Sequence, residues 1–276
     1  MSDTVRDLVV GFFAAALISG LASERVQRAT ERQLRRDLRT HDLRVRIDQA
    51  GPLGMLFGRA SVVRVGGSGA SLDSAPLVVR PGAGLSARVR SIRLDLRESA
   101  AGDLEVDRMQ AHFSDAWVDV GALMRDRIVV RAAGEGVASI MVGEDLIARL
   151  ASRRFRASRN VVARVTPDRL VVSADVELLG ARSRVEVTGR LALLDGARLA
   201  VDRPSVRLNG LLLDEAASAG LVAPMNPVID LGRDLRTSMK LRATAVHLER
   251  GQVRLEARVS LPVESCAPQG VEDGSS

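Results

Sequence analysis

Alternation of apolar and charged residues runs through most of the chain after His41. It is strict in Leu43–Asp48, and it returns in residues 241–259, where two alternating runs flank Arg250-Gly251. Successive side chains of a strand point to opposite faces, so each run predicts a strand with one buried and one solvated face. Asp195-Gly196, between two further apolar runs, predicts a hairpin turn. The expected fold is therefore α+β, dominated by an antiparallel sheet.

Only a few segments have a helical pattern. Residues 143–153 carry Glu144 and Asp145 in the first turn and arginine at the end, which matches the helix dipole. Leu146, Ile147 and Leu150 would form the apolar face of this helix. The other expected helices are residues 23–39, 211–221 and 226–236, with a short helix or tight loop at 53–58.

The composition limits both the core and the partners. Apolar residues make up 46% of the 276 residues but aromatic residues only 2%, so the core must consist of Val, Leu, Ile and Ala. With so few aromatic side chains to stack on bases, nucleic acid is not an expected partner. Of the 40 basic residues only Lys240 is lysine, and the formal charge is +6. Most arginines alternate with acids and predict a mixed solvated face, although a surface that attracts anionic lipid remains an alternative.

The N-terminal segment, residues 8–23, is apolar and uncharged. As a helix it would be about 24 Å long, short of the roughly 30 Å hydrocarbon core of a bilayer. It is therefore a marginal membrane span, a signal-peptide core or a helix docked on the protein. Six arginines follow within residues 25–39, and the positive-inside rule would keep them cytoplasmic. We expect a membrane-associated protein on the envelope or periplasmic side, with a cytoplasm-facing peripheral location as the alternative.

The helix expected at residues 23–39 also has two interpretations. It packs on a sheet, or its basic face lies on anionic headgroups.

No arrangement of residues suggests catalysis. The three histidines, His41, His112 and His247, are far apart, and Cys266 has no base near it in the sequence. A lone cysteine also excludes an intramolecular disulfide. Three carboxylates at residues 103, 105 and 107 share one strand face and are expected to form a solvated edge rather than a Ca²⁺ site. We therefore expect neither a catalytic residue, nor a metal, nor a cofactor.

Pairs of adjacent apolar residues interrupt the alternation. They occur at Val161-Val162, Val171-Val172, Leu178-Leu179 and Leu193-Leu194, and in the triplet 211–213. Strands covered on both faces would explain them, and so would an internal apolar groove. Such a groove suits acyl chains, because each buried CH₂ contributes about 0.8 kcal/mol.

Three motifs occur in a characteristic order. The first is Gly51–Arg59 (GPLGMLFGR), followed by a valine-rich strand. The second is Glu144-Asp145-Leu146, and the third is Asn226-Pro227 before the final hairpin. Over roughly residues 5–262 this order resembles the LmeA-like family of bacterial phospholipid-binding cell-envelope proteins.

The resemblance implies a tubular lipid-binding-like fold, in which a long curved antiparallel sheet wraps around a few helices and forms an apolar groove. It divides the chain into an apolar membrane or signal segment (1–22), a lipid-binding domain (23–262) and a disordered tail (263–276). The implied role is non-enzymatic binding of phospholipid in envelope maintenance, with phospholipid and an anionic membrane surface as partners. The alternatives are a scaffolding envelope protein with a filled interior and an unrecognised lipid hydrolase or transferase.

Candidate lipid-contacting residues follow from these expectations. Arginines at the mouth of the groove would pair with the phosphate. The candidates for the apolar groove are Leu53, Leu56, Phe57, Leu146, Leu150, Leu211 and Leu212, and those for the mouth are Arg59, Arg64, Arg153 and Arg154.

Overall fold

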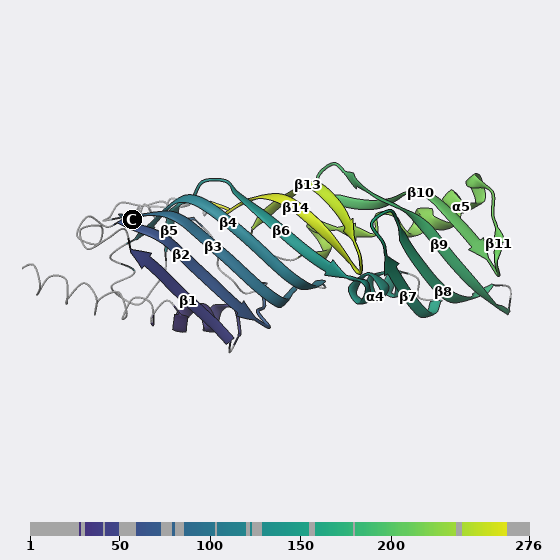
Figure 1. Ribbon diagram of the computed structural model, residues 1–276, viewed down its shortest axis with the longest axis horizontal. Helices are drawn as coiled ribbons and strands as arrows, with labels where there is room; N and C mark the ends of the chain where they lie inside the picture. Colours follow the sequence, from purple (N-terminus) through teal and green to yellow (C-terminus); the bar gives the residue numbers. More distant parts are fainter. Residues whose placement is uncertain are drawn as a thin grey trace, which may run out of the picture.

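The protein forms two β-sheets placed end to end in an elongated molecule (Figure 1). This computed structural model describes residues 28, 31–40, 42–49, 59–72, 79, 80, 86–102, 104–119, 122, 129–154, 158–178, 180–235 and 239–263. The N-terminal apolar segment, the loop expected at 53–58 and residues 264–276 lie outside the described residues. The division of the chain into three segments given above therefore remains a prediction.

The first sheet has eight strands, in the order β1-β2-β3-β4-β6-β14-β13, with β5 paired to β4. The pairing is antiparallel except between β2 and β3, which run parallel. The strands are β1 (Asp42–Gln49), β2 (Arg59–Ser68), β3 (Ser86–Ala101), β4 (Leu104–Asp119), β5 (Val130–Ala132), β6 (Gly136–Gly143), β13 (Lys240–Glu249) and β14 (Gln252–Ser260).

The second sheet has six strands, in the order β11-β10-β9-β8-β7, with β12 paired to β10. It is formed by the chain between β6 and β13, so the chain leaves the first sheet and later returns to complete it. The strands are β7 (Ser158–Val165), β8 (Leu170–Leu178), β9 (Ala181–Leu194), β10 (Arg198–Leu208), β11 (Leu211–Leu212) and β12 (Ile229–Asp230).

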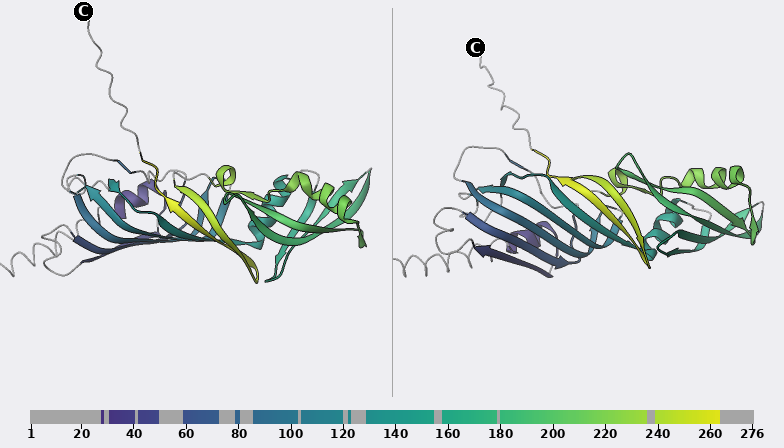
Figure 2. Two further views of the ribbon diagram at one scale, coloured as in Figure 1. Left: turned by 90° about the horizontal axis from the view of Figure 1, so that it is seen from above. Right: turned by 45° about the horizontal axis from the view of Figure 1, so that its top comes forward.

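The helices are short and lie against the sheets (Figure 2). Residues 31–37 are helical and confirm that part of the helix expected at 23–39. The others are α4 (Glu144–Arg154), the expected central helix, and α5 (Glu215–Val222), η1 (Ala223–Met225) and α6 (Leu231–Asp234). Within the described part of the chain, no helix is long and apolar enough to cross a membrane.

Two helix predictions were wrong in their extent. Leu211 and Leu212 form β11 and pair with β10, and the helix expected from residue 211 begins only at Glu215. Its start is set by Asp214, whose side chain accepts a hydrogen bond from Ala217 N at 2.7 Å. Of the helix expected at 226–236 only Leu231–Asp234 is helical, capped by Asp230.

Two residues with positive φ reset the alternation in the β3–β4 hairpin. Asp115 (φ 52°) separates the buried Phe113 and Ala116, which lie three positions apart instead of two. Glu98 (φ 48°) separates Leu96 and Ser99 in the same way. These two resets keep one face of each long strand buried along its whole length.

The prediction of a β-dominated fold with few helices is confirmed, but two sheets replace the single sheet that was expected. The break occurs where α4 follows β6. Ala243 N donates to Gly196 O at 2.7 Å, and Gly251 N donates to Val165 O at 3.0 Å. These bonds join the turns of one sheet to the strands of the other. The buried apolar side chains of both sheets form one continuous core.

Candidate functional site

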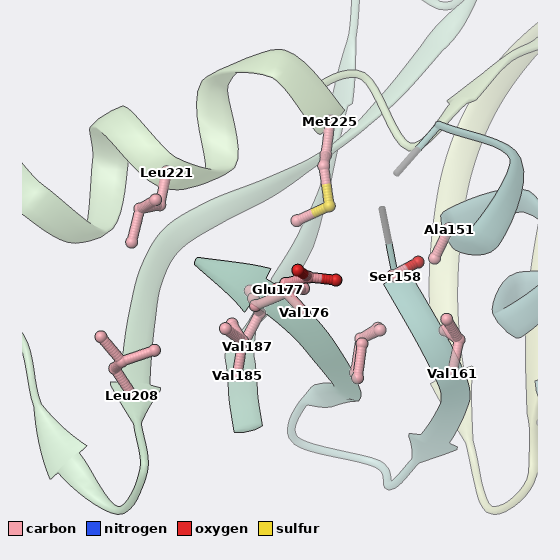
Figure 3. Close-up of a pocket in the computed structure, with 12 residues that line it drawn as sticks. Ala151, Ser158, Val161, Val176, Glu177, Val185, Val187, Leu208, Leu221 and Met225 are labelled. Atoms are coloured by element: carbon pink, nitrogen blue, oxygen red, sulfur yellow. The ribbon is translucent and has the colours of Figure 1, made fainter. Parts of the chain in front are cut away.

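An apolar cavity lies between the inner face of the second sheet and a helical cover formed by α5 and η1 (Figure 3). Its volume is about 120 Å³, which is below the range of about 300–1,000 Å³ for small-molecule sites and suits a short stretch of hydrocarbon. It is lined by Ala151, Ser158, Val161, Val172, Ala174, Val176, Glu177, Val185, Val187, Leu208, Leu221 and Met225.

The floor of the cavity consists of small aliphatic side chains at alternate positions. Val172, Ala174 and Val176 come from β8, and Val185 and Val187 come from β9. Alternation along each strand brings them to one face of the sheet. They are half-buried except Val176 and Val187, which are buried. The floor therefore offers hydrocarbon contact and no hydrogen-bonding side chain.

The doubled apolar residues have a structural explanation here. Val161 and Val172 line the cavity, whereas Val162, the neighbour of the first, is 49% exposed. The inner surface of the cavity thus uses one member of Val161-Val162 and one member of Val171-Val172, whereas Leu193, Leu194 and residues 211–213 do not line it.

The cover leaves this space open because its side chains are small. α5 has the sequence EAASAGLV, and from this helix only Leu221 lines the cavity. Met225 of η1 also points toward the floor, as Figure 3 shows. Ser218 and Val222 are the buried residues that seat α5 on the sheet. Val206 N donates to Ser218 Oγ at 3.2 Å.

Side-chain hydrogen bonds hold η1 over the cavity. Asn226 accepts from Val201 N at 2.9 Å and donates from Nδ2 to Val201 O at 3.0 Å. Arg154, at the end of α4, donates to Met225 O at 3.3 Å and to Asp234 Oδ2 at 2.9 Å. At the start of α4, Glu144 accepts from Val165 N at 2.7 Å. Both ends of α4 are therefore tied to the second sheet or its cover.

Asp234 is the centre of a charged cluster beside the cover. Burial acts to raise its pKa, but the hydrogen bonds from Arg233 and Asp230 N and the charges of Arg154 and Arg233 outweigh this effect. The net pKa of Asp234 is lowered, so its carboxylate is ionised at neutral pH and anchors both arginines.

Polar groups are rare in the cavity wall. Among the described lining residues, Glu177 is the only charged one, and Ser158 is the only other with a polar side chain. Glu177 is exposed to solvent. An aliphatic chain could occupy the cavity while a polar group stayed near Glu177 and solvent.

The cavity continues into an exposed apolar surface, here called the apolar tip and consisting of Leu211, Leu212 and Leu221. Their exposed fractions are 74%, 64% and 40%. Leu221 also lines the cavity, and Leu211 pairs with Leu208, which lines it as well, so two residues connect the tip with the cavity wall. β11 and α5 lie at the end of the molecule farthest from β1 (Figure 1).

The structure places the sequence-derived candidates around the cavity rather than in its wall. Leu146 and Leu150 are buried on the apolar face of α4, and their neighbour Ala151 reaches the cavity. Leu211 and Leu212 belong to the apolar tip.

The candidate arginines lie apart from one another. Arg154 supports the cover, whereas Arg153 is exposed at the end of α4. Arg64 is in the first sheet, where its Nη1 lies 2.7 Å from Asp48 Oδ2. Leu53, Leu56, Phe57 and the side chain of Arg59 lie outside the described residues.

Sequence reasoning missed Leu221 and Met225, which form the roof of the cavity. They follow the floor by about 40 residues, and no local pattern connects them to it. Asn226-Pro227 was the nearest signal, since the Asn226 side chain fixes the position of η1.

The described residues contain no group of three or more His, Cys, Asp or Glu that could hold a metal ion. No curated protein and no solved structure shows significant similarity to the chain. The LmeA-like phospholipid-binding family model, in contrast, matches residues 13–258, which is most of the chain. An apolar cavity with few polar groups agrees with that description, and the chain therefore belongs to the LmeA-like phospholipid-binding family.

Proposed function

We propose that the protein binds a phospholipid by holding acyl chain in the cavity of the second sheet, with the headgroup left outside. Leu221 carries this proposal, because it is both exposed at the surface and part of the cavity wall. Each CH₂ moved from water into such a wall contributes about 0.8 kcal/mol. The binding is non-enzymatic and supports lipid or glycolipid maintenance in the cell envelope.

The apolar tip provides the route of entry. Its exposed leucines would contact the bilayer interface, where an acyl chain could pass from the membrane to the cavity without crossing water. Arg154 would contribute to lipid binding by fixing the position of Met225. Leu146 and Leu150 would contribute by packing α4 against the core. A scaffolding protein with a filled interior would need no such open space, and for that reason the lipid-binding function is favoured.

The test is to fill the cavity. Ala174→Phe projects a ring from β8 into the cavity, whereas Ala181→Phe makes the same change at an exposed alanine of β9. The full chain is purified from membranes, and phospholipid per protein is measured by mass spectrometry, with thermal unfolding as the check of folding. Ala174→Phe should remove most of the bound lipid and Ala181→Phe should retain it. Equal lipid content in a folded Ala174→Phe variant would refute the proposal.

A further inference from the structure

One row of side chains, mostly arginines, crosses the outer face of the first sheet. The pairing register places Arg46 opposite Arg64 and Arg64 opposite Arg93. The row continues through β4, β6, β14 and β13. Its members, here called the arginine row, are Arg46, Arg64, Arg93, His112, Val137, Arg258 and Arg242, and all are exposed. With about 4.8 Å between strands, the row is about 29 Å long.

This arrangement is unfavourable for the sheet by itself. Like charges directly opposite each other on neighbouring strands are destabilising, and the row contains three adjacent arginine pairs. The second sheet shows the favourable alternative, because Arg190 lies opposite Asp202 and Arg207 lies opposite Glu186. Repulsion between neighbouring arginines therefore destabilises the first sheet locally, and a ligand of opposite charge would offset this repulsion.

The guanidinium groups of the row are largely available. Within the described part of the chain, the guanidinium groups of Arg93 and Arg258 form no hydrogen bond or ion pair. Arg64 is paired with Asp48, whose Oδ2 lies 2.7 Å from Arg64 Nη1. Two other nearby acids are engaged with residues outside the row. Asp95 accepts two hydrogen bonds from Arg108, at 2.8 and 2.6 Å. Glu256 lies 3.5 Å from His247 Nε2.

The centre of the row combines positive charge with an apolar contact. Arg64, Arg93, His112, Val137 and Arg258 line one shallow depression, which the carboxylates of Asp95 and Glu256 also border. Val137, in the middle, is 60% exposed. Arginines pair well with phosphate groups. An exposed valine beside them would gain apolar contact with the hydrocarbon that begins below a headgroup layer, and a free phosphate ion offers no such contact. This combination distinguishes a bilayer surface from a soluble anion.

We propose that the arginine row is a docking surface for a bilayer that contains anionic phospholipid. It lies on the sheet that does not contain the cavity, and it acts on intact membrane rather than on a single bound lipid. Docking would hold the molecule at a membrane independently of the lipid in the cavity. Because ions screen exposed charges, docking should weaken as the salt concentration rises.

The experiment uses the full chain with Cys266→Ser and a single fluorophore on Val137→Cys. Vesicles of phosphatidylcholine, with or without phosphatidylglycerol, carry a quencher in their headgroup layer. The label should be quenched on the anionic vesicles and not on neutral ones. Arg93→Gln with Arg258→Gln should shift the docked fraction about 30-fold toward the free form, from the contribution of each arginine at an anionic surface.

Two controls isolate the row. A label on Val162→Cys, an exposed valine of the second sheet, should stay unquenched. Arg164→Gln with Arg169→Gln removes the same charge from two exposed arginines at β7 and the turn after it, and should leave the quenching of the Val137 label unchanged.

Three outcomes overturn the proposal. The Val137 label could stay unquenched on anionic vesicles, or the Val162 label could be quenched equally. The third is displacement by inorganic phosphate, but not by chloride at equal ionic strength, which would mark a site for free phosphate. The lipid content of the cavity is measured in the same preparations. A row variant that loses docking but keeps its cavity lipid separates this proposal from the proposed function.

Discussion

The two sheets follow the same alternating pattern, but the apolar cavity described above, which is formed by described residues, belongs to the second. In the first sheet the inner face carries large buried side chains such as Met109 and Phe113, and Leu38 and Leu72 belong to the same buried core. In the second sheet the inner face is covered by α5, whose side chains are mainly those of alanine, serine and glycine. The cavity therefore depends on small side chains both in the cover and on the strands beneath it.

The outer faces of the two sheets differ in how their charges pair, and here the first sheet is the unusual one. The second sheet pairs arginines with acids across its strands, whereas the first aligns arginine with arginine. Each sheet therefore departs from an ordinary solvated sheet on one face only, the second on its inner face and the first on its outer face. The predictions below contrast the two sheets, beginning with the largest expected change in stability.

Removing a core leucine should destabilise the first sheet far more than the second. Leu96→Ala, at a side chain buried in the first sheet, should lower the free energy of unfolding by about 2–5 kcal/mol. Leu208→Ala, at the cavity wall, should cost less than half of that, because its side chain already borders empty space. Chemical denaturation measures both. Equal losses would show that the cavity is filled in the protein.

Breaking the charged cluster beside the cover should cost more than breaking a surface pair. Asp234→Asn leaves Arg154 and Arg233 without their carboxylate and should lower stability by about 1–3 kcal/mol. Asp95→Asn removes a more exposed pair in the first sheet, worth less than about 1 kcal/mol.

The contribution of Asp234 should also depend on pH. Because its pKa is lowered in the folded protein, its stabilising effect is present at neutral pH and is lost as the pH falls below the ordinary aspartate value of about 3.9. Acid titrations of stability should therefore be steeper for the unmodified protein than for Asp234→Asn. If stability fell equally steeply with pH in both proteins, Asp234 would not be an ionised, stabilising group.

Two buried serines give a smaller contrast. Ser218→Ala deprives Val206 N of its acceptor and should cost about 1–2 kcal/mol. Ser99→Ala removes a bond to Arg97 O, which still accepts from Gly69 N, and should cost less. Hydrogen exchange at Val206 should rise only in the first variant. A larger loss from Ser99→Ala would mean that α5 is held by other contacts.

Changes at the apolar tip should affect function and hardly affect stability. Leu211→Ser with Leu212→Ser should alter the free energy of unfolding by no more than about 0.5 kcal/mol, because both side chains are exposed. Uptake of a fluorescent phospholipid from neutral vesicles should slow, and that effect should not depend on salt. Uptake that depends on the salt concentration would contradict this prediction and would mean that charged groups, not the leucines of the tip, contact the membrane.

Much of the fold was predictable because its signals are local. Alternation marked the strands, and the acidic start and basic end of Glu144–Arg154 marked α4. The start of α5 was missed because the capping role of Asp214 outweighs the apolar run of Leu211 to Leu213. The doubled valines indicated a groove, but its roof depends on contacts distant in the chain.

The arginine row could not be derived from the sequence. It exists only in the pairing register, and the face that each member takes depends also on the positive-φ residues Glu98 and Asp115, which shift the alternation in the long hairpin. Arg93 and His112 each look like ordinary exposed strand residues. Their alignment with Arg258 requires a strand that joins the sheet more than 100 residues later.

The space beneath the small side chains of α5 also affects how substitutions change the thermal stability of this protein and its capacity to bind lipid. Replacing Ala174, on the floor beneath this helix, with a larger apolar residue would fill empty space and favour the folded state. A screen for thermal stability alone would therefore select variants that close the cavity. Under the proposed function, the most heat-resistant descendants of this chain should be those whose cavity no longer accepts an acyl chain, a trade between stability and activity that natural proteins often show.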